Sequence, residues 1–332
     1  MRKGDSMINK LSFYISDCHN PYTNLATEKY LLDCTKNDEL ILYLWQNQNT
    51  VVIGKNQNAL TECKCALLEE DGGHLARRLS GGGSVFHDLG NLNFTFLCHA
   101  ENYDLSKQMQ VIKEACVLGG ISAEISGRND ILAHGRKFSG NAFYNSRGKS
   151  YHHGTILVNA DKEKLGKYLT PPKAKLQSKG VKSVKSRVIN LSEINPALTI
   201  EMMKEYMLSA FENVYGLSPS SFIIDDTSQI SDLAEEYASW EYLYAPSLPF
   251  TFSCEGNFTW GNIELQLDVK EGRIQSVGVY TDAMEHNLPD MLNDALKDCI
   301  FRMEELEKSI IEKIPEPISG DISRLLKSQE LN

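Results

Sequence analysis

The segment ARRLSGGGSVFHDLGNLNFTF, residues 76–96, decides how this chain folds and what it can bind. Its three consecutive glycines, Gly81 to Gly83, are costly inside a helix or strand, because each loses about 0.5–1 kcal/mol of backbone entropy relative to alanine. Without Cβ atoms, their amide groups can turn toward one concavity and cradle an anion, with Arg77 and Arg78 at its edge. The pattern predicts either such an anion-binding loop or an ordinary glycine turn.

Outward from this segment, the chain alternates strand and helix patterns. Apolar residues alternate with polar ones over 91–97, which predicts a strand with one buried face. Apolar runs at 40–45 and 50–54 flank the polar sequence QNQN and predict a hairpin. Apolar residues recur at helical spacing over 105–118 and 200–215, each stretch ending at a glycine, and these stripes are interpreted as core faces.

The composition describes an ordinary folded protein. Its 332 residues suggest about two domains, and 42% hydrophobic residues with 23% charged residues exclude disordered and collagen-like chains. The net charge of −10 disfavours binding to nucleic acid. No run reaches the roughly 18 apolar residues of a membrane span, and the beginning lacks an export signal, so we expect a cytoplasmic protein. Eight scattered cysteines then predict buried thiols and not a disulfide framework.

The sequence APSLP at 245–249 carries two prolines and predicts a domain boundary. Residues 250–332 are expected to form a small accessory domain of strands followed by one amphipathic helix, from about Leu288 to Lys313. Residues 1–245 mix hairpins and helices without a regular βαβ alternation, which predicts an α+β catalytic domain with mixed sheets. Asn20 and Pro21 are typical of a helix start, and the helix is expected to run to about residue 36.

Familiar motifs of other enzymes are missing. Phe86 stands where a dinucleotide fingerprint needs its third glycine, and no phosphate-binding P-loop sequence is present. The Cys63-x-Cys65 pair has no second pair for zinc, and there is neither an HExxH nor a G-x-S-x-G sequence. An anion site in this chain therefore belongs to another fold.

Residues 127–144 predict a strand, a tight turn at 134–136 and a returning strand that carries Lys137. A lysine on a sheet is commonly a solvated edge residue. Here Asp130 precedes it across the proposed hairpin, so the lysine can lie near a carboxylate that holds a divalent cation. Further on, His152 and His153 begin another strand, and because neighbouring strand residues face opposite ways, only one of them can line a given pocket.

The stretch PPKAKLQSKGVKSVKSR, residues 171–187, holds five lysines and one arginine and no acidic residue. It is interpreted as a solvated loop, as a basic lid over a polyphosphate or as a docking patch for an acidic protein.

Taken together, RRLSGGGSVFHDLGNLNF, GRKFSGNA, HHGTILVNAD and SKGVKSVKSRVINL resemble the lipoate–protein ligase family, from about Phe13 to the C-terminal helix. The resemblance implies the catalytic fold shared with biotin–protein ligases and class II aminoacyl-tRNA synthetases, followed by a small C-terminal domain. It implies ATP-dependent activation of (R)-lipoate to lipoyl-AMP. The lipoyl group would then pass to a lysine of an apo carrier domain, either an E2 subunit of a 2-oxoacid dehydrogenase or the glycine cleavage H protein. A monomer is expected.

By position, the resemblance implies that Lys137 contacts both nucleotide and lipoate. The other implied ATP contacts are Arg78, Gly83, Ser84, Val85 and Phe86. The other implied lipoate contacts are His87, Ser139, Gly140 and His153. One departure is Ser84, because the family more often has alanine there.

The chemistry of these residues suits acyl-adenylate formation. Attack of a carboxylate on the α-phosphorus gathers negative charge on the equatorial oxygens, and Lys137 is the candidate for stabilising it. Asp130 is the candidate ligand for Mg²⁺. An apolar slot for the acyl tail is expected from Val85, Phe86 and the face bearing Leu92 and Phe94.

Three other functions remain possible from the residues. An octanoyl or lipoyl transferase would move acyl groups between carrier proteins without ATP, and the intact arginine and glycine segment with the C-terminal domain argues against it. A non-catalytic paralogue that binds lipoate would be expected to lose Lys137. A biotin ligase is disfavoured because the sequence SVFHD follows the glycines.

Overall fold

A computed structural model of the chain describes residues 8–55, 57, 59–126, 130–169, 188–244, 250–281, 283, 285 and 287–329. The chain divides into two compact units. The first comprises residues 1–57 and 72–238, and the second comprises residues 58–71 and 239–332. The expected basic lid at 171–187 and the proline-rich joint at 245–249 lie outside the described residues.

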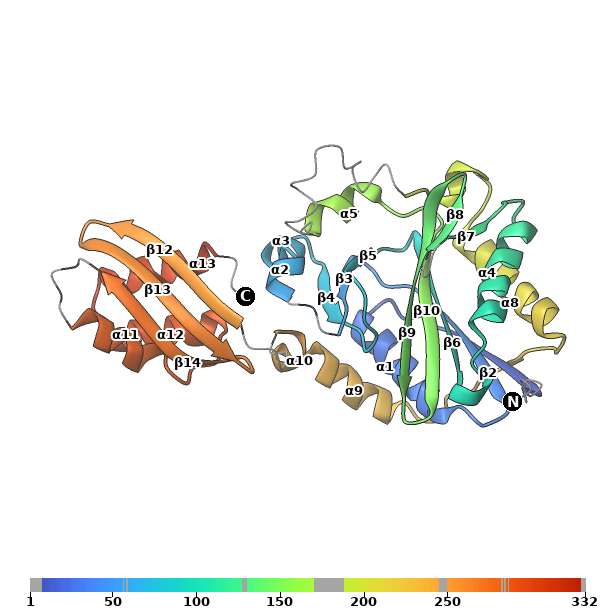
Figure 1. Cartoon of the computed structure of the whole chain (residues 1–332), viewed down its shortest axis with the longest axis horizontal. Coiled ribbons are helices and arrows are strands. Elements are labelled where there is room, and N and C mark those ends of the chain that lie inside the picture. Colours follow the sequence, from blue (N-terminus) through green and yellow to red (C-terminus); the bar gives the residue numbers. More distant parts are fainter. Residues whose placement is uncertain are drawn as a thin grey trace. The chain divides into compact units, whose positions relative to one another are not determined.

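The first unit is built on an eight-stranded mixed sheet (Figure 1). In spatial order its strands are β11 (Ser220–Ser221), β1 (Lys10–Ile15), β2 (Glu39–Trp45), β6 (Asn91–His99), β10 (Lys149–Leu157), β9 (Arg136–Ser146), β8 (Asp130–Ala133) and β7 (Glu124–Ser126). β1 pairs in parallel with β2 and β11, and the remaining neighbours are antiparallel. The predicted turn at 134–136 is confirmed, because β8 and β9 form a hairpin there.

A second sheet of three strands lies in the same unit, in the order β4 (His74–Arg77), β3 (Thr50–Ile53) and β5 (Val85–His87). The predicted hairpin of residues 40–54 is therefore wrong, since β2 pairs with β1 and β6 while β3 pairs with β4 and β5. Both strands are completely buried, so each finds partners on both edges and passes into a different sheet.

The helices of the first unit cover both faces of the large sheet, and one of them packs against β5 of the small sheet (Figure 1). They are α1 (Pro21–Cys34), η1 (Ala100–Asn102), α4 (Leu105–Leu118), α5 (Lys162–Tyr168), η2 (Leu191–Glu193), α8 (Ile200–Tyr215) and α9 (Ser228–Ala238). α4 and α8 cover one face, and α1 covers the other, where α9 packs against it. The three helices predicted from the sequence are confirmed, with α1 capped by the Asn20 side chain.

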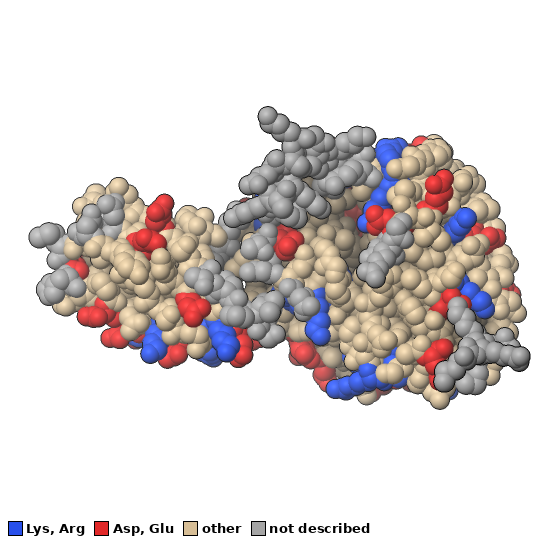
Figure 2. Space-filling view, viewed as in Figure 1, with Lys and Arg blue, Asp and Glu red and all other residues tan. Residues whose placement is uncertain are grey.

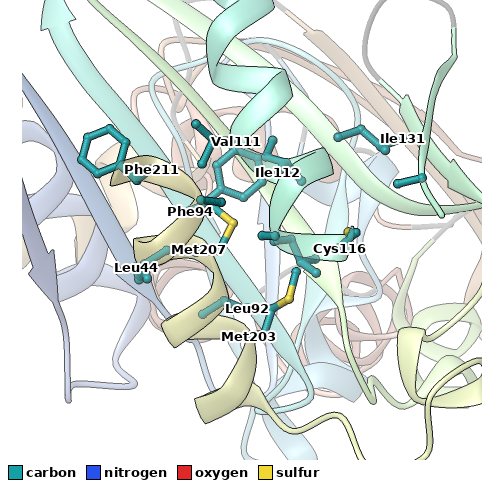
Figure 3. Close-up of a cluster of buried hydrophobic side chains, with 14 of the residues drawn as sticks. Leu44, Leu92, Phe94, Val111, Ile112, Cys116, Ile131, Met203, Met207 and Phe211 are labelled. Carbon is teal, nitrogen blue, oxygen red and sulfur yellow. The ribbon is translucent and has the colours of Figure 1, made fainter. Parts of the chain in front are cut away.

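The main core lies between the sheet and the pair α4 and α8 (Figure 3). Leu92 and Phe94 of β6 point into it and pack with Ile112 of α4 and Met207 of α8. All four side chains are fully buried. Complete burial of such side chains contributes about 1.5–3 kcal/mol each. The opposite face of β6, with Asn93, is also buried, so the predicted strand is correct but the expectation of a single buried face is wrong.

The second unit contains a three-stranded antiparallel sheet, a layer of helices and a short helical segment from earlier in the chain. Its elements are α2 (Ala59–Glu62), α3 (Cys65–Glu70), α10 (Trp240–Tyr244), β12 (Phe250–Phe258), β13 (Gly261–Lys270), β14 (Arg273–Thr281), α11 (Leu288–Leu296), α12 (Met303–Lys313) and α13 (Ile318–Lys327). The single helix predicted over 288–313 is wrong, because the chain breaks between α11 and α12. Asp298 is left-handed there, with φ of 64°, and Phe301 donates its amide to the Gly272 carbonyl.

The architecture is α+β with mixed sheets and flanking helices, as predicted. Acidic and basic side chains are interspersed over the face seen in Figure 2, without a continuous basic stripe among its described residues. Throughout the described chain, no helix has the length and apolar character that a membrane crossing requires. All eight cysteines are free thiols, and burial raises the pKa of Cys98 and Cys116 to about 12, as expected for buried structural thiols.

Candidate active site

A cavity of about 270 Å³ opens in the first unit between its two sheets. The small sheet and the loop after β4 supply one wall. Strands β2, β6, β8, β9 and β10 supply the opposite wall, and α1 adds Leu25. The lining residues are Leu25, Trp45, Val52, Arg78, Gly82, Gly83, Ser84, Val85, His87, Asn93, Asp130, Lys137, Gly140, Asn141, Ala142, His153, Gly154 and Thr155. The structure therefore brings most of the predicted site residues into one cavity.

Arg78 braces the glycine loop from within. Its guanidinium is 6% exposed and donates to the carbonyls of Gly81 at 2.8 Å, Gly83 at 2.7 Å and Val52 at 3.1 Å. Burial lowers its pKa to about 10. The loop also passes close to Gly54, where a Cβ atom would collide with the Gly82 carbonyl oxygen. The charge of Arg78 thus fixes the shape of the loop, and its direct contact with a nucleotide stays a prediction.

The shape of the loop leaves its amide groups available. Gly82 has φ of +96°, a conformation that favours glycine. Among the described residues, none accepts a hydrogen bond from the amides of Gly81, Gly82 or Gly83. Because carbonyls of this loop are held by Arg78 while these amides have no acceptor, the loop can offer N–H groups to an anion.

Lys137 lies across the cavity from the glycine loop, near the start of β9. Its Nζ is 2.7 Å from Asp130 Oδ1 on β8, and the two side chains are 40% and 42% exposed. The predicted proximity of lysine and carboxylate is confirmed. At this exposure the ion pair contributes little to stability, so the ammonium can exchange one anionic partner for another at small cost.

Gly140 makes room for that lysine. A Cβ atom on Gly140 would stand 2.9 Å from Lys137 Nζ and 3.0 Å from its Cε. The backbone amide of Gly140 donates to Thr155 Oγ1 at 3.3 Å, which ties β9 to β10 beside the cavity. Any larger residue at 140 would displace the ammonium from its present position.

His153 is the histidine that faces the cavity, and its ring is held at both nitrogens. Nδ1 lies 2.8 Å from Glu28 Oε1 on α1, and Nε2 lies 2.7 Å from Ser80 Oγ, just before the glycine loop. His152 faces the core, where Asn141 Oδ1 is 2.8 Å from its Nε2. The prediction that only one of the two neighbours lines the cavity is confirmed.

His87 also lines the cavity, between the sheets. Its Nδ1 lies 3.3 Å from Asn47 Nδ2, and because an amide nitrogen only donates, Nδ1 is the acceptor and Nε2 carries the proton. Burial, followed by the positive charge of Arg78, lowers the pKa of His87 to about 3. His87 is therefore a neutral imidazole near neutral pH.

Of the residues expected to form the apolar slot, Val85 lines the cavity and the others do not. Leu92 and Phe94 lie in the core on the far face of the sheet and do not line the cavity. The Phe86 side chain packs on Tyr168, with ring centroids 5.4 Å apart, and Ser139 of β9 is fully buried. Neither Phe86 nor Ser139 lines the cavity. The apolar part of the lining comes from Leu25, Trp45, Val52, Val85 and Ala142.

The described residues contain no group of three or more His, Cys, Asp or Glu side chains arranged for a metal. Asp130 is the one carboxylate in the described lining of the cavity. Mg²⁺ in nucleotide sites commonly takes one or two carboxylates and completes its shell with phosphate oxygens and water. A single carboxylate therefore suits an ion carried in by a nucleotide and does not suit a resident metal.

Sequence reasoning missed Glu28, Ser80 and Trp45. A signal for Glu28 was present, since it occupies the buried stripe of α1 at helical spacing from Asn24 and Leu31, where an acidic residue requires partners. Trp45 is hidden within a continuous apolar run and has no such signal.

Comparisons with known proteins show the family of the chain. Residues 20–212 match the family model of the lipoyl protein ligase A/B catalytic domain, and residues 247–324 match that of the bacterial lipoate protein ligase C-terminus. The chain is 38% identical to a lipoate-protein ligase A of Bdellovibrio bacteriovorus, over 92% of each protein. It is 40% identical to one of Psychrobacter cryohalolentis, over 90% of this chain and 91% of that relative.

Solved structures show the same fold. The structure of P. falciparum LipL1 in complex with lipoate aligns with a TM-score of 0.63 at 30% identity, covering 95% of this chain and 98% of that one. A bipartite lipoate protein ligase of Thermoplasma acidophilum, described with its E2 lipoyl domain, aligns with a TM-score of 0.62 at 25% identity, covering 72% of this chain and 96% of that one. The resemblance read from the sequence motifs is thereby confirmed, and the chain belongs to the lipoate–protein ligase family of enzymes.

Proposed function

We propose that this enzyme uses ATP to activate lipoate as lipoyl-AMP and then transfers the lipoyl group to the ε-amine of a lysine on an apo lipoyl carrier domain. The observation that carries the proposal is the single cavity in which the glycine loop, the ammonium of Lys137 and an apolar wall with Trp45 and Val85 lie together. An acyl-adenylate needs these three environments, for its phosphate, its reacting carboxyl group and its acyl tail.

Lys137 is proposed to stabilise the charge that develops when the lipoate carboxylate attacks the α-phosphorus. A preorganised cation at that position contributes roughly 10²–10³ in rate when it acts as transition-state donors usually do. Asp130 Oδ1 lies 2.7 Å from the Lys137 ammonium and so holds it at the cavity that both residues line. Asp130 is also the proposed carboxylate for Mg²⁺, which when bound with ATP supplies positive charge at the pyrophosphate.

The second half-reaction needs no enzyme nucleophile. The mixed anhydride is already activated, so a deprotonated lysine of the carrier needs chiefly to be held close to the acyl carbon. E2 lipoyl domains and the glycine cleavage H protein are the proposed acceptors, supported by the carrier domain described with the Thermoplasma relative.

The proposal is tested by incubating the protein with ATP, Mg²⁺, lipoate and an apo E2 lipoyl domain. We expect pyrophosphate release and a carrier whose intact mass rises by one lipoyl group. Lipoyl transfer from an acylated carrier without pyrophosphate would identify a transferase instead. Binding of lipoate with neither product would identify a non-catalytic paralogue.

A further inference from the structure

A chain of buried hydrogen bonds connects Glu28 of α1 with the glycine loop. It begins at Arg78, whose Nε lies 3.1 Å from Ser80 Oγ, and continues through His153 to Glu28 Oε1. From the other side, Thr95 Oγ1 donates to the same Glu28 oxygen at 2.7 Å. The first four side chains come from the loop after β4, from β10 and from α1, so the chain joins three elements.

The ends of the chain set the direction of its bonds. An arginine Nε can only donate, so Ser80 Oγ accepts from Arg78, and an ionised Glu28 carboxylate can only accept, so it accepts from His153 Nδ1. A neutral imidazole has one ring proton, so Nε2 is then the acceptor for the Ser80 hydroxyl. His153 Nδ1 therefore carries the ring proton and donates it to the Glu28 carboxylate. In this arrangement Glu28 determines the tautomer of His153, and His153 determines where the Ser80 hydroxyl points.

The side chains of this hydrogen-bonded chain are buried, so losing any one of its bonds is costly. Arg78 and His153 are 6% exposed, and Ser80 and Glu28 are 1% exposed. A guanidinium enclosed to this degree requires compensating charge or complete hydrogen bonding. Glu28 supplies negative charge that opposes the effect of burial on Arg78. The same guanidinium holds the carbonyls of Gly81 and Gly83, so a change at Glu28 reaches these carbonyls through His153, Ser80 and Arg78.

We propose that Glu28 is a positioning residue for the nucleotide half of the site, acting through His153 and Ser80 on the glycine loop that Arg78 braces. This inference rests on the proposed function. It predicts that substitution of Glu28, on α1, raises the KM for ATP more than the KM for lipoate.

The experiment compares Glu28→Gln with Glu39→Gln in steady-state adenylation. Glu39 is a matched control, because it is a 1% exposed glutamate that pairs with Lys10 and Ser12 at the start of β2, away from the cavity. For Glu28→Gln we expect a roughly tenfold rise in KM for ATP, as hydrogen bonds to charged groups usually give, with less than about a threefold change in KM for lipoate. Glu39→Gln should leave both KM values unchanged.

A double-mutant cycle with Ser80→Ala separates positioning from simple loss of structure. Both variants interrupt one chain, so the double variant should be no worse than the more damaged single variant. Additive effects, or equal rises in both KM values, would overturn the proposal.

A further measurement uses the unmodified protein and does not depend on how the variants fold. Ring nitrogen shifts of ¹⁵N-labelled histidine should show His153 protonated at Nδ1 and unprotonated at Nε2. The opposite tautomer would also overturn the proposal. If the unmodified protein forms no adenylate from ATP and lipoate, the proposed function fails, whereas the tautomer still tests the hydrogen-bonded chain.

Discussion

The two faces of the large sheet are built from the same strands, but one face forms the hydrophobic core and the other lines the cavity. On the face toward α4 and α8, Leu92, Phe94 and their neighbours form an apolar core. On the face toward α1, Asn93 and Thr95 of the same strand lie among hydrogen-bonded polar groups beside the cavity. Because strand side chains alternate, a single residue step separates a change that affects stability from one that affects chemistry.

The largest effect is expected on the core face. Phe94→Ala should lower the free energy of unfolding by about 3–5 kcal/mol, because it leaves a cavity in closely packed surroundings. Asn93→Ala, one step along the strand, should cost less, about 1–3 kcal/mol, because it removes the acceptor of the buried Asn91 side-chain amide. Urea unfolding of both variants measures the difference, and equal losses would show that the two faces are not distinct in this way.

On the cavity face, the largest effect is expected at Lys137. Lys137→Ala should reduce adenylation roughly 10²–10³-fold with little change in stability, because it removes a preorganised cation from the transition state. Lys149→Ala is the control, since that lysine lies at the far end of the neighbouring strand, where it donates to the Asp33 and Thr35 carbonyls. Undiminished pyrophosphate release by Lys137→Ala would remove this residue from the mechanism.

The core-facing His152 predicts a stability change with pH. Burial lowers its pKa from 6.5 to about 3. The unfolded chain therefore binds a proton more readily, and stability should fall as pH decreases from 6.5 toward 3, by up to about 1.4 kcal/mol per pH unit for this group. A His152→Phe variant should show a shallower dependence in urea titrations, whereas His134→Gln, an exposed turn residue, should keep the original slope.

The smallest effect on activity is expected at Gly140, which lies beside the Lys137 ammonium. Gly140→Ala should push the Lys137 ammonium aside and reduce adenylation roughly fivefold to tenfold, because small misplacements of a reacting group are costly. The fold should tolerate the change, since the atoms in the way are the flexible end of a lysine. Gly166→Ala, where a Cβ atom would meet nothing within 4 Å, should keep full activity.

Much of the fold and part of the site could be predicted because the deciding patterns were local. The alternation in β6, the cap of α1 and the glycine stop of α8 are all visible within a few residues. The pairing of β2 and β3 was not, because a continuous apolar run shows burial but not which sheet a strand enters. The break between α11 and α12 contains neither glycine nor proline, so it had no sequence signal either.

The site shows the same limit. The glycine loop and Lys137 are conspicuous in sequence, and the structure places them in one cavity. The role of Arg78 as a brace could not be predicted, because its partners are backbone carbonyls, which every residue possesses. The slot for the acyl tail was assigned to the wrong face of β6, since alternation alone does not say which of two buried faces holds the cavity.

The division of the chain into units bears on how the protein could be shortened. Residues 58–71 belong with the C-terminal unit although they precede most of the catalytic sequence, and Leu60 packs against that unit's core. A fragment ended at residue 244 would keep the contact of α2 with α10 but would lose the core against which Leu60 and Trp240 pack. Polar replacements at these two positions would be the first changes to make in a shortened enzyme.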